Sequence, residues 1–326
     1  MKIVFHNRLN RLWLQKIEEL RHEFKHVDFV TDPDGVESAL GSANALVTGG
    51  ISLELIRRAQ GLEILFVPFA GVDGLPLDYV REQGVKISNA HGNAPYVAER
   101  GIAMALAFYG KVIDYHNDLK ECRWHGFAAH RGIRDTWDSI RGKTCSILGT
   151  GEIGKQIAKL LNVFGCRVIG FKKRPVSEAL EHFEQITYDL DEALQEGELI
   201  FICLPLTAQT KGMFSAEILA GLKGKFLVNL GRGGIVDEEG LYRALKNGIL
   251  KGAGIDVWYE YPKEGGNERN PSKYPIHDLP NVVLSPHVAG FTAQAATLNI
   301  EQTIDNIRAY LKTGKPVFEV NAGLMY

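Results

Sequence analysis

Long apolar runs are missing from this sequence of 326 residues. No run approaches the roughly 18 apolar residues of a membrane-spanning helix, and the first five residues lead into an expected strand rather than a signal peptide. The net charge is only -2, which gives no electrostatic reason to expect nucleic acid or an anionic membrane as a partner. With 45% hydrophobic and 23% charged residues, the composition is that of an ordinary globular chain. We therefore expect a cytoplasmic protein.

Cysteine is also scarce. The four cysteines, Cys122, Cys145, Cys166 and Cys203, show neither a C-x-x-C pair nor the spacing of metal ligands, so we expect no metal site. Cys145, Cys166 and Cys203 occur in apolar runs. These three are expected to be buried free thiols in a reducing compartment.

Internal repeats, low-complexity tracts and flexible linkers are absent, and short apolar runs instead alternate with helical patterns. This alternation predicts α/β units with parallel sheets. We expect one domain at residues 1–95 plus 291–326, where a helix from residue 292 returns to the first domain, and a second at 96–290. A single long helix is predicted from Pro95 to about Lys120, apolar on more than one side and therefore buried between domains or against another subunit. Residues 123–138 look irregular and aromatic, either an arm onto a partner or a loop over the core.

A glycine-rich turn organises the second domain. Residues 143–148 read as a buried strand, and Gly149, Gly151 and Gly154 follow in G-x-G-x-x-G spacing. A helix is expected over 155–164 and a second strand over 167–171. A lone glycine triplet is weak evidence, but the strand before it, the helix after it and the second strand are all in place. The stretch therefore predicts a dinucleotide site, with the pyrophosphate at the helix N-terminus.

The second strand lacks the carboxylate that usually follows it. NAD-binding chains place Asp or Glu about 20 residues beyond the glycines to hold the ribose 2′-hydroxyl, but residues 155–177 contain neither. Lys172, Lys173 and Arg174 stand there instead. Lysine and arginine pair with a 2′-phosphate, which favours NADP over NAD; the alternative is a solvated basic turn.

Polar residues of catalytic type follow three later strand patterns. Arg232 follows the strand expected at 226–230, Asp256 ends the next, and His287 follows the last. Ligands of open α/β sheets bind at such strand ends. A guanidinium can hold a carboxylate bidentately, and a histidine can exchange the proton of a hydroxyl as a hydride leaves the same carbon. Together they predict a site for an oxidoreductase.

Several motifs closely resemble the D-isomer-specific 2-hydroxyacid dehydrogenase family, which includes glyoxylate/hydroxypyruvate reductases and phosphoglycerate dehydrogenases. They are the glycine turn from residue 142, Cys203-Leu-Pro-Leu-Thr207, Val228-Asn-Leu-Gly-Arg-Gly-Gly-Ile-Val-Asp-Glu-Glu-Gly-Leu241, Ser285-Pro-His-Val-Ala-Gly290 and Val97-Ala-Glu99. The resemblance implies an α/β protein of two Rossmann-like domains with the active site in the cleft between them, and usually a homodimer built on the cofactor domains. It implies an NAD(P)-dependent enzyme that interconverts a small 2-oxo acid and its D-2-hydroxy acid.

The same resemblance assigns roles to residues of this chain. Arg232 matches the substrate-binding arginine and His287 the acid/base histidine, while Gly71, Val72 and Asn93 match positions near the substrate. Asp256 matches the residue that faces the nicotinamide amide. The remaining residues expected at the cofactor are Gly149, Thr150, Gly151, Glu152, Ile153, Gly154, Lys172, Lys173, Arg174, Cys203, Leu204, Pro205, Thr210, Leu230, Gly231, Ala289 and Gly290.

One departure from the family pattern concerns the catalytic glutamate. The family has a run like Asp-Val-Phe-x-x-Glu-Pro, whereas this chain has Asp256-Val-Trp-Tyr-Glu-Tyr-Pro262, so Tyr261 stands in the glutamate's place and Glu260 lies one residue early. Arg100 also replaces a usual histidine. Either Tyr261 or Glu260 could serve as the partner of His287. Two alternatives to reduction of a 2-oxo acid therefore stay open, a formate-like oxidation that moves no hydroxyl proton and a dinucleotide-sensing binding protein like the C-terminal binding protein corepressors.

Overall fold

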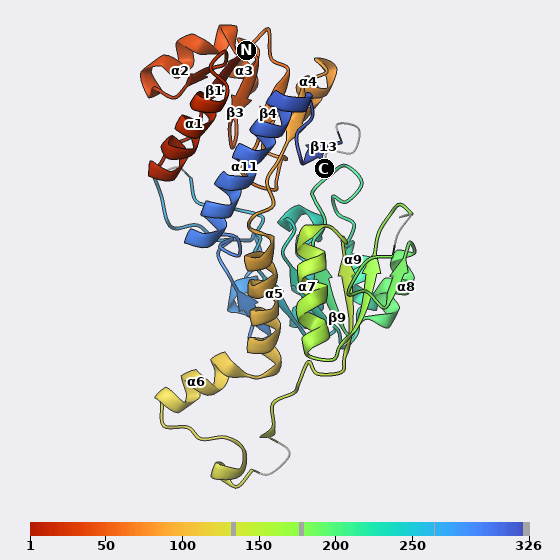
Figure 1. Ribbon diagram of the computed structural model, residues 1–326. Helices are drawn as coiled ribbons and strands as arrows, with labels where there is room; N and C mark the ends of the chain where they lie inside the picture. Colours follow the sequence, from red (N-terminus) through yellow and green to blue (C-terminus); the bar gives the residue numbers. More distant parts are fainter. Residues whose placement is uncertain (132–134, 176–178, 264, 322–326) are drawn as a thin grey trace. The chain divides into compact units, whose positions relative to one another are not determined.

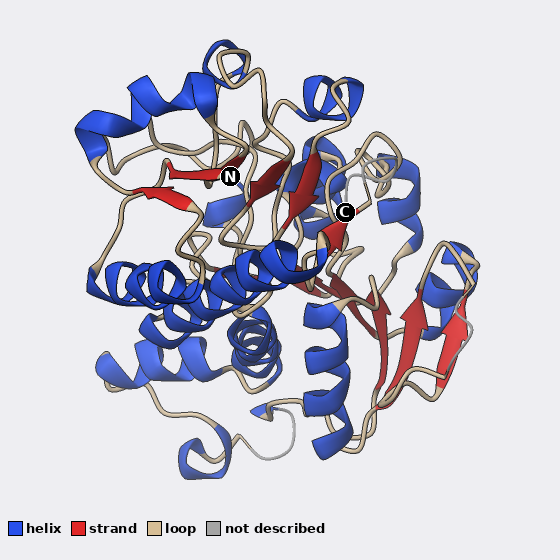
Figure 2. Cartoon of the chain, turned by 45° about the horizontal axis from the view of Figure 1, so that its top comes forward, coloured by secondary structure: helices blue, strands red, loops and turns tan. Residues whose placement is uncertain are grey.

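The computed structural model describes residues 1–131, 135–175, 179–263 and 265–321, and the chain divides into two compact units. Unit 1 comprises Met1–Asn93 with Phe291–Tyr326, and unit 2 comprises Ala94–Gly290. Each unit has its own sheet, flanked by helices (Figure 2). The α/β fold class with two largely parallel sheets is confirmed. No helix in the described ranges is long and apolar enough to cross a membrane.

Unit 1 is a six-stranded sheet in the order β13-β5-β4-β3-β1-β2. All neighbouring strands are parallel except β13, which runs antiparallel to β5. The order of β2-β1-β3-β4-β5 is that of flavodoxin-like folds, and it reverses between β1 and β3. The strands are β1 (Lys2–Phe5), β2 (Asp28–Val30), β3 (Ala45–Val47), β4 (Ile64–Phe66), β5 (Lys86–Ser88) and β13 (Glu319–Val320).

Alternate residues of these strands enter two separate cores, because successive side chains of a strand point to opposite faces. Ile3 and Phe5 pack with helices α1 (Arg11–Glu23) and α11 (Ala293–Thr313), whereas Val4 packs on the other face. That other face is covered by α2 (Pro33–Ala39), the 3-10 turn η1 (Leu40–Ser42), α3 (Leu53–Ile56) and α4 (Leu77–Glu82). The late helix α11 is thus part of unit 1, beside α1 (Figure 1).

Unit 2 is a seven-stranded parallel sheet in the order β12-β11-β10-β9-β6-β7-β8, which reverses between β6 and β9. This is the doubly wound Rossmann order with one further strand. Ile147 faces a core beneath α5 and α7, and Leu148 faces a core beneath α8, α9 and α10. The strands are β6 (Thr144–Leu148), β7 (Arg167–Phe171), β8 (Gln185–Thr187), β9 (Leu199–Ile202), β10 (Phe226–Asn229), β11 (Gly252–Ile255) and β12 (Val282–Leu284). The helices and 3-10 turns are α5 (Ala94–Tyr109), α7 (Glu152–Val163), α8 (Leu190–Glu196), α9 (Ala216–Gly221), η4 (Gly233–Ile235), α10 (Glu238–Lys246) and η5 (Ile276–Asp278).

The single helix expected from Pro95 to Lys120 is wrong, because the structure has two helices there. Helix α5 ends at Tyr109, and α6 (Val112–Lys120) starts after Gly110 and Lys111. Lys111 adopts a left-handed conformation with φ 49°, which an α-helix does not accommodate. Helix α5 is buried within unit 2, where it packs beside α7 (Figure 1), but α6 buries none of its described residues.

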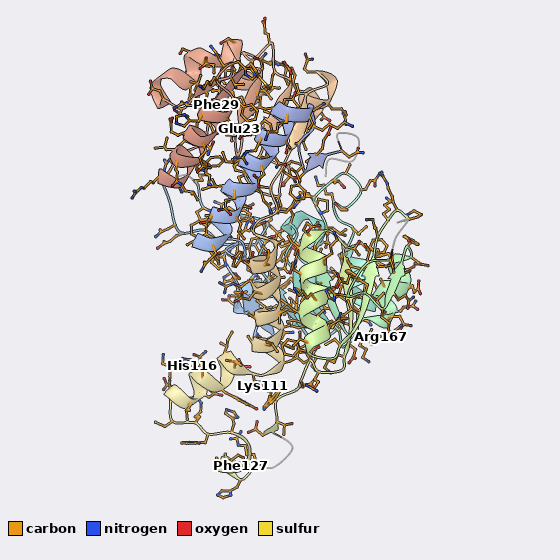
Figure 3. The ribbon with its side chains drawn as sticks, in the orientation of Figure 1. Glu23, Phe29, Lys111, His116, Phe127 and Arg167 are labelled. Atoms are coloured by element: carbon orange, nitrogen blue, oxygen red, sulfur yellow. The ribbon has the colours of Figure 1, made fainter. Side chains whose placement is uncertain are left out.

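The irregular aromatic stretch predicted after this helix is present, with residues 132–134 outside the described ranges. We call residues 112–131 and 135–138 the arm; it leads away from the sheet of unit 2 and carries Phe127 near its far end (Figure 3). Its described residues include the 3-10 turn η2 (Gly126–Ala129). His125 holds the arm together: its ring contacts carboxylate oxygens of Asp118 at 2.8 Å and Asp135 at 3.0 Å and stacks on Tyr115. These contacts connect α6 with the segments that follow it.

The cysteines follow the expectation in part. All four are free, and Cys145 and Cys166 are buried as predicted. Cys203 is only half-buried, because it lies just beyond the last residue of β9, where the sheet ends. Within the described ranges no group of histidine, cysteine and acidic residues is suited to hold a metal ion.

Candidate functional site

The glycine turn joins β6 to α7, and two of its glycines leave no room for a side chain. Gly149 has φ 103°, and a Cβ built there would lie 2.9 Å from the carbonyl oxygen of Cys203. A Cβ on Gly154 would lie 2.0 Å from the carbonyl oxygen of Gly149. Both approaches are shorter than any ordinary contact. These two glycines are therefore required by the backbone path itself, whether or not a ligand is bound.

The third glycine has a different role, because Gly151 is the N-cap of α7 and makes no side-chain capping hydrogen bond. A Cβ on Gly151 would have nothing within 4 Å. The first N–H groups of α7 therefore have no capping side chain at Gly151 and lie at the positive end of the helix dipole. Beside them, the hydroxyl oxygen of Thr150 is buried without a hydrogen-bond partner among the described residues. This arrangement fits the pyrophosphate of a dinucleotide.

The basic residues follow β7, which is the neighbour of β6. Leu148 pairs with Phe171 in the parallel register, so Gly149 and Lys172 are the next residues on adjacent strands. The backbone N–H of Lys172 donates to Thr187 O at 3.1 Å, and Lys173 Nζ donates to Gln209 Oε1 at 3.0 Å. Lys173 and Arg174 are exposed, and Lys172 is half-buried. The structure thus brings three cations beside the glycine turn.

The Cys203–Thr210 segment lies on the other side of the glycine turn, after β9. The Cys203 N–H donates to Leu148 O at 2.8 Å, and Thr210 Oγ1 donates to Pro205 O at 2.6 Å. Although Cys203 as a residue is half-buried, its thiol is surrounded by protein, and this loss of solvation raises the pKa of the thiol to about 12, so the sulfur stays protonated at neutral pH. A Cβ on Gly231 would lie 2.6 Å from Leu204 O, which shows how closely the loop after β10 approaches. Residues 203–210 and 230–231 therefore lie close together, after the neighbouring strands β9 and β10.

Arg232 follows the end of β10 in a turn shaped by Asn229. The side chain of Asn229 accepts from the N–H of Gly231 and donates to Arg232 O, both at 3.1 Å. Arg232 is half-buried, and its Nη1 donates to Gly231 O at 2.8 Å. The motif contained Asn229, but the sequence reasoning gave it no role. The available signal was an asparagine at the end of an apolar strand, two residues before the Gly231–Arg232 pair.

Asp256 directly follows β11, and its side chain fixes the loop that carries His287. The residue is 2% exposed, and its carboxylate accepts hydrogen bonds from Ser285 Oγ and from the backbone N–H groups of Val288 and Ala289. His287 lies inside this loop with φ 60°, a strained value for a residue with a side chain. Such strain persists where the surrounding structure holds it, and it concentrates at functional sites. That Asp256 faces a nicotinamide stays a prediction, while its contacts to the His287 loop are direct.

The side chains of Tyr261 and Glu260 contact different partners. The Tyr261 ring lies 5.5 Å from the His287 ring at an interplanar angle of 47°, and its hydroxyl accepts from the N–H of Trp258 at 3.0 Å. Glu260 instead pairs with Arg269, with 2.9 Å between Oε2 and Nη2. Because β10, β11 and β12 are neighbours in the sheet, Arg232, Tyr261 and His287 belong to one edge of unit 2.

The remaining predicted substrate residues belong to unit 1. Gly71 and Val72 follow β4, in a turn held by a hydrogen bond of 2.8 Å from Asn89 Nδ2 to Ala70 O. The Val72 side chain lies in the core, so only its backbone is available to a ligand. Asn93 Oδ1 is buried and has no hydrogen-bond partner in the ranges described.

Comparisons with known proteins agree with this geometry. Residues 102–289 match the family model described as the NAD binding domain of D-isomer specific 2-hydroxyacid dehydrogenases. Glycerate dehydrogenase of Methylorubrum extorquens is 29% identical, and glyoxylate/hydroxypyruvate reductase B of Pectobacterium carotovorum is 30% identical; each match covers 92% of this chain and 93% of the relative. The structure of the PH0520 protein from Pyrococcus horikoshii matches with a TM-score of 0.80 and 26% identity, over 98% of this chain and 95% of that one. The resemblance and the prediction of an enzyme that uses a nicotinamide dinucleotide are thereby confirmed, and the chain belongs to the D-isomer specific 2-hydroxyacid dehydrogenase family.

Proposed function

We propose that this enzyme reduces a small 2-oxo acid to the D-2-hydroxy acid and prefers NADPH as the reductant. The observation that carries the proposal is the order of functional groups along the carboxyl edge of the sheet in unit 2. Cations follow β7, the glycine turn follows β6, and Arg232 and His287 follow β10 and β12. The strands β7 and β10 are three positions apart, about 14 Å at the usual spacing of about 4.8 Å. The edge thus offers separate places for the adenosine end, the pyrophosphate and the reacting end.

In this proposal each residue has a defined task in the reaction. The guanidinium of Arg232 holds the substrate carboxylate through paired N–H donors. When bound, the nicotinamide supplies the hydride that adds to the carbonyl carbon. His287 in its imidazolium form donates the proton that the carbonyl oxygen gains, and it ends neutral. Asp256, through Ser285 and the N–H groups of Val288 and Ala289, fixes the loop from which His287 acts.

The preference for NADPH follows from Lys172, Lys173 and Arg174. Three cations and no carboxylate stand where a chain selective for NAD has an acidic residue. A 2′-phosphate would gain charge-assisted hydrogen bonds there. NAD remains a usable alternative in this proposal, because the glycine turn contacts the pyrophosphate that both cofactors share.

Glyoxylate and hydroxypyruvate are the first substrates to screen, because the relatives include a reductase named for both. A second candidate is formate oxidation, in which no hydroxyl proton moves. Its support is the phenol of Tyr261, which stands where the family has a carboxylate beside the histidine. The substrate contacts of Gly71, Val72 and Asn93 and a cytoplasmic location stay predictions.

A homodimer is also part of the proposal, and the arm of unit 2 supports it. Trp124, Phe127 and Trp137 are 60%, 91% and 59% exposed, an unusual display of large apolar side chains. The contacts of His125 with Asp118 and Asp135 connect the stretches of the arm that carry these side chains. Light scattering should report a dimer, and Phe127→Asp together with Trp137→Asp should convert it to a monomer.

The activity is tested by a spectrophotometric screen of 2-oxo acids with NADPH and NADH. An assay of formate with NADP tests the second candidate, formate oxidation. Arg232→Lys keeps the charge but loses the planar fork. We expect the KM for the 2-oxo acid to rise more than tenfold while the Kd for NADPH changes little. An unchanged KM would remove Arg232 from the substrate site, and turnover of formate alone would replace the proposed reaction.

A further inference from the structure

The sheet of unit 1 has a cavity at its carboxyl edge to which the proposed reaction gives no role. The cavity has a volume of about 500 Å³ and is lined by the turn His6–Leu9 after β1, by Thr31 after β2, and by side chains of α1 and α2. Small-molecule sites usually have volumes of about 300–1,000 Å³. Strand β1 also borders the reversal of the strand order, and ligands of open α/β sheets bind outside the carboxyl ends of strands at such a reversal.

This cavity is separate from the residues of unit 1 that are predicted to contact the substrate. Gly71 and Val72 follow β4, whereas the cavity lies between the turns after β1 and β2. In the sheet order, β4 and β2 are three positions apart, which is about 14 Å at the usual spacing of about 4.8 Å. A ligand in the cavity would therefore occupy a second site in unit 1.

The charges around the cavity favour a ligand with a single carboxylate. Arg8 is exposed, and within the described ranges no hydrogen bond or ion pair engages its guanidinium. Glu37, the other charged lining residue, pairs with Arg58, with 3.6 Å between Oε2 and Nη1. Thr31 Oγ1 accepts from Arg21 Nη2 at 3.2 Å, which leaves the Thr31 hydroxyl able to donate. A planar guanidinium binds a carboxylate through two parallel N–H donors, and the threonine hydroxyl can add a third donor.

Asn7 adds a requirement for a hydrogen-bond donor on the ligand. Its Oδ1 is buried and has no hydrogen-bond partner among the described residues. Its Nδ2 donates to Arg8 O at 3.4 Å, and turning the amide over would instead place two oxygen acceptors against each other. Leaving a buried acceptor unpaired costs free energy. A ligand that brings an O–H or N–H group to Asn7 Oδ1 removes this cost.

The remaining lining is apolar. Leu9 lies in the turn after β1, Val36 is buried on α2, and Leu14 is 47% exposed on α1, where Trp13 and Ile17 are buried. We propose that the cavity binds a small aliphatic acid that carries a hydroxyl or ammonium group on the carbon next to its carboxylate. Arg8 holds the carboxylate, Asn7 Oδ1 accepts from the neighbouring hydroxyl or ammonium, and the aliphatic part lies against the leucines. This second site does not depend on the proposed reduction.

The test titrates the full-length protein with four related compounds and follows the methyl signals of Leu9, Leu14 and Val36 by NMR. The compounds are 2-hydroxyisovalerate, valine, isovalerate and 3-methyl-2-butanol. Isovalerate lacks the donor for Asn7, and the alcohol lacks the carboxylate for Arg8. We expect 2-hydroxyisovalerate or valine to bind at least about tenfold more tightly than either of these two. Both results support the site, and the tighter of the two ligands identifies a hydroxy acid or an amino acid as the source.

Variants assign the two contacts separately. Arg8→Gln should weaken binding of the preferred acid by about tenfold or more. Asn7→Leu should abolish the advantage of the preferred acid over isovalerate, because both then lack a partner at this position. Arg11→Gln removes an exposed arginine of α1 that does not line the cavity, and this matched control should change neither result. Arg232→Lys, which alters the proposed substrate site, should also leave the methyl shifts in place.

Three outcomes would overturn the proposal. They are the absence of saturable methyl shifts with all four compounds, equal affinity for isovalerate and the preferred acid, and shifts that persist in Arg8→Gln but disappear in Arg232→Lys. If Asn7→Leu does not fold, the comparison of the preferred acid with isovalerate in the wild-type protein still decides the role of Asn7. The titration requires no turnover, so a chain that reduces no 2-oxo acid would count against the proposed reaction only.

Discussion

The two sheets of this protein reverse their strand order in the same way, but their first turns are built oppositely. In unit 1 the turn after β1 is His6-Asn-Arg-Leu-Asn10, and Asn10 caps α1 by accepting from the N–H of Trp13 at 3.0 Å. In unit 2 the turn after β6 is made of glycines, and Gly151 leaves the N-terminus of α7 without a side-chain cap. The N-terminus of α1 is thus capped by a side chain of the protein, whereas the N-terminus of α7 is not. A doubly wound sheet therefore does not by itself make a nucleotide site; the turn does.

Among the variants that test this contrast between the two turns, Gly154→Ala should have the largest effect on cofactor binding. A Cβ there would meet the carbonyl oxygen of Gly149 at 2.0 Å, so the turn must open before the side chain fits. We expect NADPH binding, measured by fluorescence titration, to fall below detection. Thermal unfolding should show a loss of about 1–3 kcal/mol, the usual cost of overpacking. Retention of wild-type affinity would mean that the turn does not hold the cofactor.

The second prediction concerns the position after the second strand of each unit. In unit 2 this is Lys172 and in unit 1 it is Thr31. Lys172→Asp with Lys173→Ser and Arg174→Ser should lower kcat/KM for NADPH by one to two decades, because a charge-assisted contact to phosphate contributes about 1.5–3 kcal/mol. The value for NADH should hardly change. Thr31→Asp, the matched control in unit 1, should affect neither. An equal fall in kcat/KM with NADPH and with NADH would show that the cations do not bind the 2′-phosphate.

The difference between the two turns could be predicted from the sequence because it is local. The spacing of Gly149, Gly151 and Gly154, the buried strand before them and the cations after β7 all lie within about 30 residues, and short-range geometry decides them. The end of α5 at Tyr109 could not be predicted from the sequence, because it depends on Lys111 in a left-handed conformation, which lysine rarely adopts.

The contacts around His287 could not be predicted from the sequence for a different reason. Asp256 meets its partners 29 to 33 residues later, and Glu260 meets Arg269 across a loop rich in glycine and proline. No periodicity encodes such pairs. The sequence therefore indicated which residues do the chemistry, but left open whether Tyr261 or Glu260 stands beside the histidine.

The smallest expected effects come from exchanging the caps of the two helices. Gly151 has an extended backbone, with φ -77° and ψ -165°, which suits a capping side chain. In Gly151→Asn the new amide oxygen should accept from the first turn of α7 and raise the free energy of unfolding of the cofactor-free protein by a few tenths of a kcal/mol. The same oxygen occupies an N–H group that the pyrophosphate needs, so the Kd for NADPH should rise about tenfold, or about 1.4 kcal/mol.

Asn10→Gly is the counterpart in unit 1. It should lower the free energy of unfolding by a few tenths of a kcal/mol and leave the Kd unchanged, because α1 has no ligand to exchange for its cap. Denaturant unfolding and NADPH titration of both variants check the pair. The two changes should move stability in opposite directions, and only Gly151→Asn should move affinity. If Asn10→Gly weakens NADPH binding to the same extent, the contrast between a closed and an open helix end fails. If Gly151→Asn leaves the Kd unchanged, the N-terminus of α7 is not where the phosphates bind.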